Sequence, residues 1–180
     1  NDGSLTPEDR VALGTPYPDF TWGITNTFQI KDFDISFLIQ GVQGITVLNG
    51  DVYYNETKKW NKKYTKNRWV SAEHPGDGKT PYQNVKTGHD LMLTDYPLQN
   101  ASYACLRNFT VGYTLPATAA RKIKLSGVRF YVSGSNLLYI WGSGYKGINP
   151  ESRMTSGNYS SAMISGYQRG GFPLTSTISA

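Results

Sequence analysis

The chain has 180 residues, of which 38% are hydrophobic and 13% aromatic, and its formal net charge is +5. No run of residues approaches the roughly 20 apolar residues that a membrane-spanning helix needs, and the mean hydropathy is −0.44. These averages do not exclude a transmembrane β-barrel, because its strands are alternating segments of about ten residues. The single cysteine, Cys105, excludes an internal disulfide and argues against a cysteine-based metal cluster.

The first ten residues, NDGSLTPEDR, allow two interpretations. In the first, an Asx turn leads into a short capped helix, with Thr6 as N-cap and Pro7 at the first helical position. In the second, the segment is the latter half of a calcium-binding loop, because its oxygen-bearing residues fall at ligand positions. The ligands of a Ca²⁺ or Mg²⁺ ion would then be Asp2, Ser4, Thr6 and Asp9. No other cofactor is expected.

A long β-hairpin is predicted next. Two alternating segments, 20–30 and 33–44, are joined by a two-residue turn at 31–32. Counting outward from the turn fixes the pairs, for instance Ile24 with Ile39. Because side chains alternate along a strand, one face of the hairpin is apolar and the other polar. The apolar face must lie against a protein core or against lipid.

Residues 45–100 are expected to form a long irregular loop that is functional or mobile. Six basic residues between 58 and 68 surround three aromatic residues, Trp60, Tyr64 and Trp69. Such a segment suits a solvated surface, anionic lipid headgroups, a partner protein, sugars or nucleic acid. Solvation is the simplest of these, and a nucleic-acid partner is not expected.

Three more strands are predicted over residues 101–115, 128–141 and 172–180, with a short helical turn near 117–124. A second long loop is expected at 142–171. Long connections therefore lie at one end of the strands and short connections at the other. In the strand over 128–141, alternation places four residues on the polar face: Arg129, Tyr131, Ser133 and Ser135.

Catalysis finds no support in the sequence. His74 and His89 lie in a polar loop without metal-ligand spacing, and Cys105 lies in a predicted strand, which favours a packed thiol over a nucleophile. A G-x-G-x-x-G match at 142–147 follows a strand, but Pro150 prevents the helix that a dinucleotide site requires. We therefore do not expect an enzyme.

Several motifs occur in the order typical of one family, and together they span nearly the whole chain. They are D-G-x-[IL]-x-x-x-D-R at 2–10, L-G-x-P-x-P-x-F at 13–20, G-x-x-N-x-F and K-x-F-D-[IL]-S within 23–36, Q-G-x-x-G at 40–44, N-R-W at 67–69, A-S-Y-x-x-L-R-N-x-T-x-G-Y-x-L-P at 101–116, V-R-x-Y-V-S-G-x-N-L at 128–137 and G-x-N-P-E at 147–151. In these motifs the chain resembles the C-terminal portion of the SusC/RagA-type TonB-linked outer-membrane transporters of Bacteroidota. The family's terminal strand and its final aromatic residue are missing, so we expect the chain to be a piece of a longer protein.

The resemblance implies an all-β fold. Antiparallel strands would form the C-terminal part of a transmembrane β-barrel of about 22 strands, and the chain would not be a closed domain by itself. The N-terminal plug is expected to be absent from this chain. The resemblance also implies import of glycans, oligosaccharides or peptides across the outer membrane of a Gram-negative bacterium. The implied partners are the rest of the barrel and its plug, a SusD-like lipoprotein lid, TonB (through the absent N-terminal region) and outer-membrane lipid.

The resemblance further implies roles for the candidate residues. The loops at 45–100 and 142–171 would be extracellular and the turn at 31–32 periplasmic. Trp60, Tyr64 and Trp69 would contact the ligand or the lid. The polar residues that would face the lumen are Thr25, Thr27, Gln29, Ser36, Arg129, Tyr131 and Ser133.

The alternative from a different class is a soluble β-sandwich that binds carbohydrate through Trp60 and Trp69. A sandwich also predicts alternating strands, but it needs a second sheet to bury the apolar face. Monomeric, cooperative folding of the chain without detergent would favour the sandwich over the barrel.

Overall fold

The computed structural model describes residues 6, 8, 11–50, 66–80, 95–152 and 166–180. Its contacts divide the chain into two units. One unit comprises Asn1–Tyr17, Ile45–Asn100 and Ser152–Gly171; the other comprises Pro18–Gly44, Ala101–Glu151 and Phe172–Ala180. Each unit carries a β-sheet of its own.

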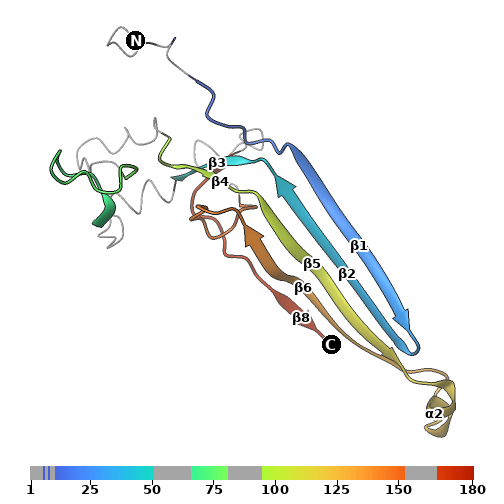
Figure 1. Ribbon diagram of the computed structural model, residues 1–180. Coiled ribbons are helices and arrows are strands. Elements are labelled where there is room, and N and C mark those ends of the chain that lie inside the picture. The colour runs from blue at the N-terminus through green and yellow to red at the C-terminus, as the bar shows by residue number, and fades with distance from the viewer. Residues whose placement is uncertain (1–5, 7, 9–10, 51–65, 81–94, 153–165) are drawn as a thin grey trace. The chain divides into compact units, whose positions relative to one another are not determined.

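The second unit is built on a five-stranded antiparallel sheet (Figure 1). In the order in which they pair, the strands are β1 (Phe20–Ile30), β2 (Phe33–Gln43), β5 (Tyr103–Thr114), β6 (Arg129–Trp141) and β8 (Thr177–Ser179). The helix α2 (Ala117–Lys122) lies in the connection between β5 and β6, at the end of the sheet where β1 turns into β2 (Figure 1). In the part of the chain that the structure describes, no helix has the length and hydropathy needed to cross a membrane.

The β1–β2 hairpin has the register predicted from the sequence. Ile24 lies opposite Ile39, and Lys31 and Asp32 form the turn. Lys31 adopts a left-handed backbone conformation with φ 55°. Positive φ values in two-residue turns match the right-handed twist of the flanking strands, so this turn continues the sheet without splaying it.

One face of the sheet is apolar across its strands. Many of its side chains are well exposed, with 54% for Ile24, 63% for Phe130 and 64% for Ile140, and most of those on β2 and β5 are half-buried. Large exposed apolar surfaces are uncommon in soluble proteins and mark contact with another body. The cross-strand rows on this face, from the turn end, are Ile30–Phe33–Tyr113–Phe130, Phe28–Ile35–Val111–Val132, Asn26–Phe37–Phe109–Gly134–Ile178, Ile24–Ile39–Leu106–Leu138 and Trp22–Gly41–Ala104–Ile140.

A β-bulge interrupts the ladder between β5 and β6. The register shifts between Leu106 and Asn108, so that Arg107 has no direct partner in the ladder. On the β6 side, Asn136 adopts φ 55°, which asparagine tolerates better than most residues. Bulges re-aim side chains, and here the bulge leaves Arg107 free to gather several partners.

The first unit contains a sheet that the sequence analysis missed. Residues 45–100 and 142–171 were predicted to be irregular, and this was wrong in part. Three short strands lie within them and pair in the order β4 (Leu98–Asn100), β3 (Thr46–Asn49) and β7 (Tyr167–Gln168). Strands of two to four residues are too short to show alternation, and they pair across long sequence separations that local patterns do not report.

The last strand is shorter than predicted. The sequence predicted a strand over 172–180, whereas β8 covers Thr177–Ser179. Pro173 cannot donate to a ladder, and the backbone before β8 is bound by side chains instead: the carbonyls of Phe172 and Thr175 accept hydrogen bonds from Asn149 and Asn136. Side-chain contacts therefore replace ladder bonds in that segment.

Candidate functional site

The polar face of the five-stranded sheet holds the residues predicted to line a lumen. The register places Thr27, Ser36, Thr110 and Ser133 in one row across four strands. The predicted set therefore lies on one face of one sheet, on the strands β1, β2 and β6: Thr25, Thr27, Gln29, Ser36, Arg129, Tyr131 and Ser133.

An ion pair crosses this face over a glycine. Arg129 on β6 donates from Nε to Asp34 Oδ1 at 3.1 Å and from Nη2 to Asp34 Oδ2 at 2.5 Å. Between them lies Gly112 on β5, where an added Cβ would collide with Arg129 Nη2 and the Asp34 carboxylate. The bidentate pair can therefore span β2 to β6 because β5 carries no side chain at that point.

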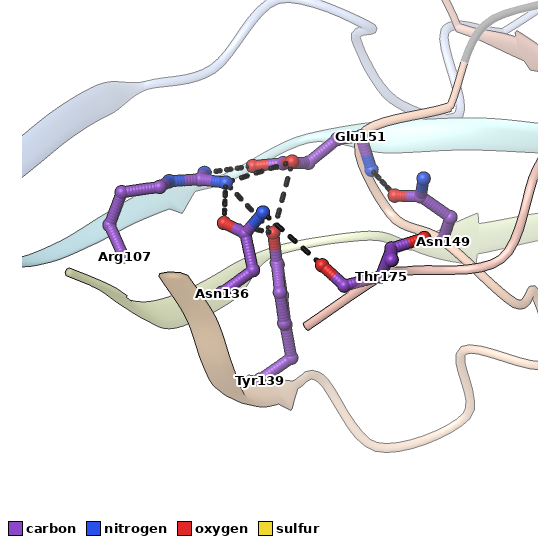
Figure 2. Close-up of polar contacts among 6 residues, drawn as sticks. All are labelled: Arg107, Asn136, Tyr139, Asn149, Glu151 and Thr175. Carbon is purple, nitrogen blue, oxygen red and sulfur yellow. Dashed lines mark hydrogen bonds and ion pairs between the residues drawn. The ribbon is translucent and has the colours of Figure 1, made fainter. Parts of the chain in front are cut away.

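A second polar cluster forms around the bulge residue Arg107 (Figure 2). Its guanidinium forms an ion pair with Glu151 and donates from Nη1 to Asn136 Oδ1 and to the Tyr139 hydroxyl, both at 2.8 Å. The Tyr139 hydroxyl also donates to Glu151 Oε2 at 3.2 Å. Gln40 on β2 joins when its amide oxygen is turned toward Arg107, accepting from Nε at 3.2 Å and Nη2 at 2.9 Å.

The charge of Glu151 is held by this cluster. Burial alone would raise the pKa of its carboxyl group, but hydrogen bonds from Arg107 and Tyr103 more than offset that effect, so the pKa lies below its ordinary value. Glu151 follows β6 and is outside the strands. It is therefore a carboxylate at neutral pH, and charge-assisted hydrogen bonds to it are the strong kind.

The cluster holds two segments that follow β6. Asn149 Oδ1 accepts from the Glu151 backbone N at 2.9 Å, and Asn149 Nδ2 donates to the Phe172 carbonyl at 3.1 Å. Asn136 Nδ2 reaches the Thr175 carbonyl at 3.5 Å (Figure 2). The arrangement thus fixes the start of one loop and the approach to β8 against the polar face.

Sequence reasoning did not pick out this cluster, although all its members except Tyr139 stand in the motifs given above. Arg107 is in A-S-Y-x-x-L-R-N, Asn136 in S-G-x-N-L, and Asn149 and Glu151 in G-x-N-P-E. The available signal was polar residues interrupting a strand pattern at Arg107 and Asn136, which is typical of a bulge.

Of the three predicted ligand or lid contacts, only Trp69 lies within the described residues. It is 44% exposed, and its backbone N donates to the Thr80 carbonyl at 2.9 Å. Asp77 caps the same turn by accepting from the backbone N of Lys79 and Thr80, and these bonds hold the pKa of the Asp77 carboxyl below its usual value. Trp60 and Tyr64 lie outside the described residues.

Only one of the four predicted metal ligands lies within the described residues. Thr6 is exposed, and Asp2, Ser4 and Asp9 lie outside the described part of the chain. Among the residues that are described, no group of three or more His, Cys, Asp or Glu side chains could hold a metal ion. The Ca²⁺ or Mg²⁺ site stays a prediction from the sequence.

Comparison with curated proteins gives consistent matches, whereas no protein-family model matches the chain. The chain is 31% identical to TonB-dependent receptor P3 of Formosa agariphila over 163 residues, which cover 87% of this chain and 15% of that receptor. It is 29% identical to TonB-dependent receptor P26 of the same organism, over 98% of this chain and 18% of that receptor. It is 27% identical to TonB-dependent receptor SusC of Bacteroides thetaiotaomicron, over 83% of this chain and 14% of SusC. The chain thus spans less than a fifth of each relative.

Solved structures show the same fold. A chain of the RagAB peptide importer in the closed-closed state matches with a TM-score of 0.64 at 19% identity, over 98% of this chain and 20% of that chain. A chain in a structure of the RagAB peptide transporter matches with a TM-score of 0.63 at 20% identity, over 92% of this chain and 17% of that chain. The expected fold is confirmed: the chain is an all-β, antiparallel segment of a larger barrel and does not close by itself.

These matches and the two-faced sheet define the class of protein, which is the TonB-dependent receptors. Within that class, the match to SusC confirms the type that the motifs indicated, and the chain belongs to the SusC/RagA family. The RagAB structures share its fold.

Proposed function

We propose that the chain is part of the barrel wall of an outer-membrane transporter that imports nutrients with energy from TonB. The observation that carries the proposal is the division of one sheet into an exposed apolar face and a hydrogen-bonded polar face. In a membrane barrel the apolar face contacts lipid and the polar face contacts a hydrated interior, so side chains alternate along each strand as they do in this sheet.

The polar face then lines the lumen or meets the plug. Its residues act passively, by presenting hydroxyl groups and a neutralised Asp34–Arg129 pair to water. Neutralised charges and hydroxyl groups suit a hydrated passage, because they bind polar solutes weakly and leave no unpaired charge at the wall.

The transported substrate is a glycan or oligosaccharide, or a peptide, and a SusD-like lipoprotein closes the barrel as a lid. The support is the likeness to SusC, and RagAB is described as a peptide importer. The loops at 45–100 and 142–171 face outside in this proposal. Trp60, Tyr64 and Trp69 contact lid or substrate, because aromatic faces stack on sugar rings and pack well in protein interfaces.

A soluble sandwich fits the observations less well. Its apolar face would have to be covered, yet Phe130 and Ile140 are 63% and 64% exposed. No described contact favours this alternative.

Uptake by cells tests the proposal. A strain that lacks the full-length receptor should lose uptake of one labelled class, oligosaccharide or peptide, and the intact gene should restore it. Purified receptor should co-purify with its lid protein. Recovery of the 180-residue chain as a cooperatively folded monomer in detergent-free buffer would contradict the barrel.

A further inference from the structure

A basic surface lies at the turn end of the five-stranded sheet, and the proposed transport does not use it. It consists of four exposed cations, here called the cationic patch: Lys31, Arg121, Lys122 and Lys124. Lys31 lies in the β1–β2 turn, and the other three lie at the end of α2 or just beyond it (Figure 1). The turn also holds Asp32, which leaves the patch with a clear positive excess.

Exposed apolar side chains lie within the patch. Ile123 is 58% exposed and Leu125 is 49% exposed, and they alternate with the cations along the chain. Together with the cations they form a short stretch that is both apolar and basic. Apolar groups beside Lys and Arg are the composition of segments that lie at a membrane surface.

Aromatic residues separate the patch from the rest of the apolar face. The row nearest the turn contains Phe33, Tyr113 and Phe130, and the rings of Phe33 and Tyr113 lie 4.7 Å apart between centroids. Moving toward the turn, the sheet therefore presents mixed aliphatic and aromatic residues, then a row with three aromatic residues, then cations. A bilayer presents hydrocarbon, interface and phosphate in the same order.

We propose that the cationic patch binds the phosphates of anionic phospholipid headgroups in the leaflet at the turn end of the sheet. The inference rests on the proposed function, because it requires the apolar face to lie in a bilayer. Cations in the last turn of a helix also complement the helix dipole. That effect explains Arg121 and Lys122, but it explains neither Lys31 nor the exposed Ile123.

The test uses the full-length receptor in nanodiscs of phosphatidylcholine with a minor share of phosphatidylglycerol. Spin-labelled forms of both lipids measure how strongly each associates with the protein. In Arg121→Gln/Lys122→Gln, the preference for phosphatidylglycerol should fall on the order of fivefold for each of the two cations removed, which is the effect of one cation at a membrane surface. Lys31 and Lys124 are left unchanged because both have positive φ.

Two matched variants control for charge and for folding. Lys66→Gln/Lys79→Gln removes the same charge from two exposed residues of the other unit and should keep the preference. Arg121→Lys/Lys122→Arg keeps the charge at the patch and should also keep it. Heat-modifiable migration on a gel verifies that each variant is folded.

The outcomes separate this inference from the proposed function. Motionally restricted phosphatidylcholine reports contact of the apolar face with lipid, and its absence in every variant would overturn the barrel. Restricted phosphatidylcholine with an unchanged preference in Arg121→Gln/Lys122→Gln would overturn the lipid site alone. If Arg121→Gln/Lys122→Gln loses uptake in cells while its lipid preference is unchanged, the cationic patch binds a periplasmic protein and not lipid.

Discussion

At the scale of single residues, the polar face depends on one missing side chain. Gly112 is buried beneath the Asp34–Arg129 pair, and an added Cβ would enter the space that both charged groups occupy. Gly23 lies on the same face of β1, but its nearest neighbours to an added Cβ are 3.8 and 3.9 Å away. A side chain is therefore sterically excluded at Gly112 but not at Gly23.

This difference predicts unequal responses to alanine. Gly112→Ala should lower the temperature at which the folded receptor is lost in heat-modifiability gels, because the ion pair must separate. Gly23→Ala should leave that temperature nearly unchanged. In a receptor that already carries Asp34→Asn and Arg129→Gln, the two alanine variants should behave alike; a persisting difference would assign the effect of Gly112 to backbone conformation instead.

The Glu151 carboxylate predicts a pH dependence. Its pKa in the folded protein is lowered, so its contribution to stability is present above the ordinary carboxyl pKa and is lost as the pH falls through the lowered value. Between about pH 7 and about pH 3, the wild type should lose stability relative to Glu151→Gln. Thermal denaturation of both proteins across that range measures the difference, and parallel curves would contradict the assignment.

At the scale of elements, depth along the strand should decide the cost of a charge. Phe109 lies in the middle row of the apolar face and Phe130 in the row nearest the turn. Both are phenylalanines on the same face, and they differ in their distance from the strand ends and in exposure, since Phe109 is half-buried and Phe130 is 63% exposed. A bilayer makes that distance matter, whereas a protein core does not impose such a gradient.

Phe109→Arg should therefore destabilise the folded barrel by about 2–4 kcal/mol and Phe130→Arg by about 0–1 kcal/mol. Thr110→Arg places the same side chain one residue away on the polar face and should be tolerated, since that face meets water. Unfolding by urea in the presence of lipid vesicles measures all three. Equal costs at Phe109 and Phe130 would point to a soluble core.

At the scale of the whole molecule, the proposed function assigns contact with lid or substrate to three aromatic residues of the loop at 45–100. Replacement of Trp60, Tyr64 and Trp69 by alanine should reduce uptake and weaken binding of the lid protein, because all three aromatic contacts are lost. A receptor with Trp69→Phe alone should retain most uptake, since an aromatic face remains. Unchanged uptake and lid binding in the triple variant would remove these residues from the site.

The sequence predicted the large sheet well because its information is local. Alternation along β1 and β2, together with a two-residue turn, sets the register of Ile24 against Ile39 without knowledge of distant residues. The assignment of one face to lipid came from the family resemblance, since alternation alone fits a sandwich equally well.

The parts that could not be predicted depend on contacts between distant residues. The buried pair Asn49 and Gln99, joined by a hydrogen bond of 3.0 Å, belongs to a sheet whose strands are too short to alternate visibly. The Arg107 cluster needs a bulge and residues 29 and 44 positions away. Neither arrangement leaves a periodic trace in the sequence.

The glycine beneath the Asp34–Arg129 pair has a consequence for how the strands find their alignment. A slip of one residue would turn apolar side chains to the wrong face, so the alternation itself opposes it. A slip of two residues keeps every side chain on its proper face and escapes that control. It would, however, bring Thr110 or Thr114 between the charged groups in place of Gly112. The absence of a side chain at Gly112 therefore favours the native register over a two-residue slip, which the hydrophobic pattern alone would permit.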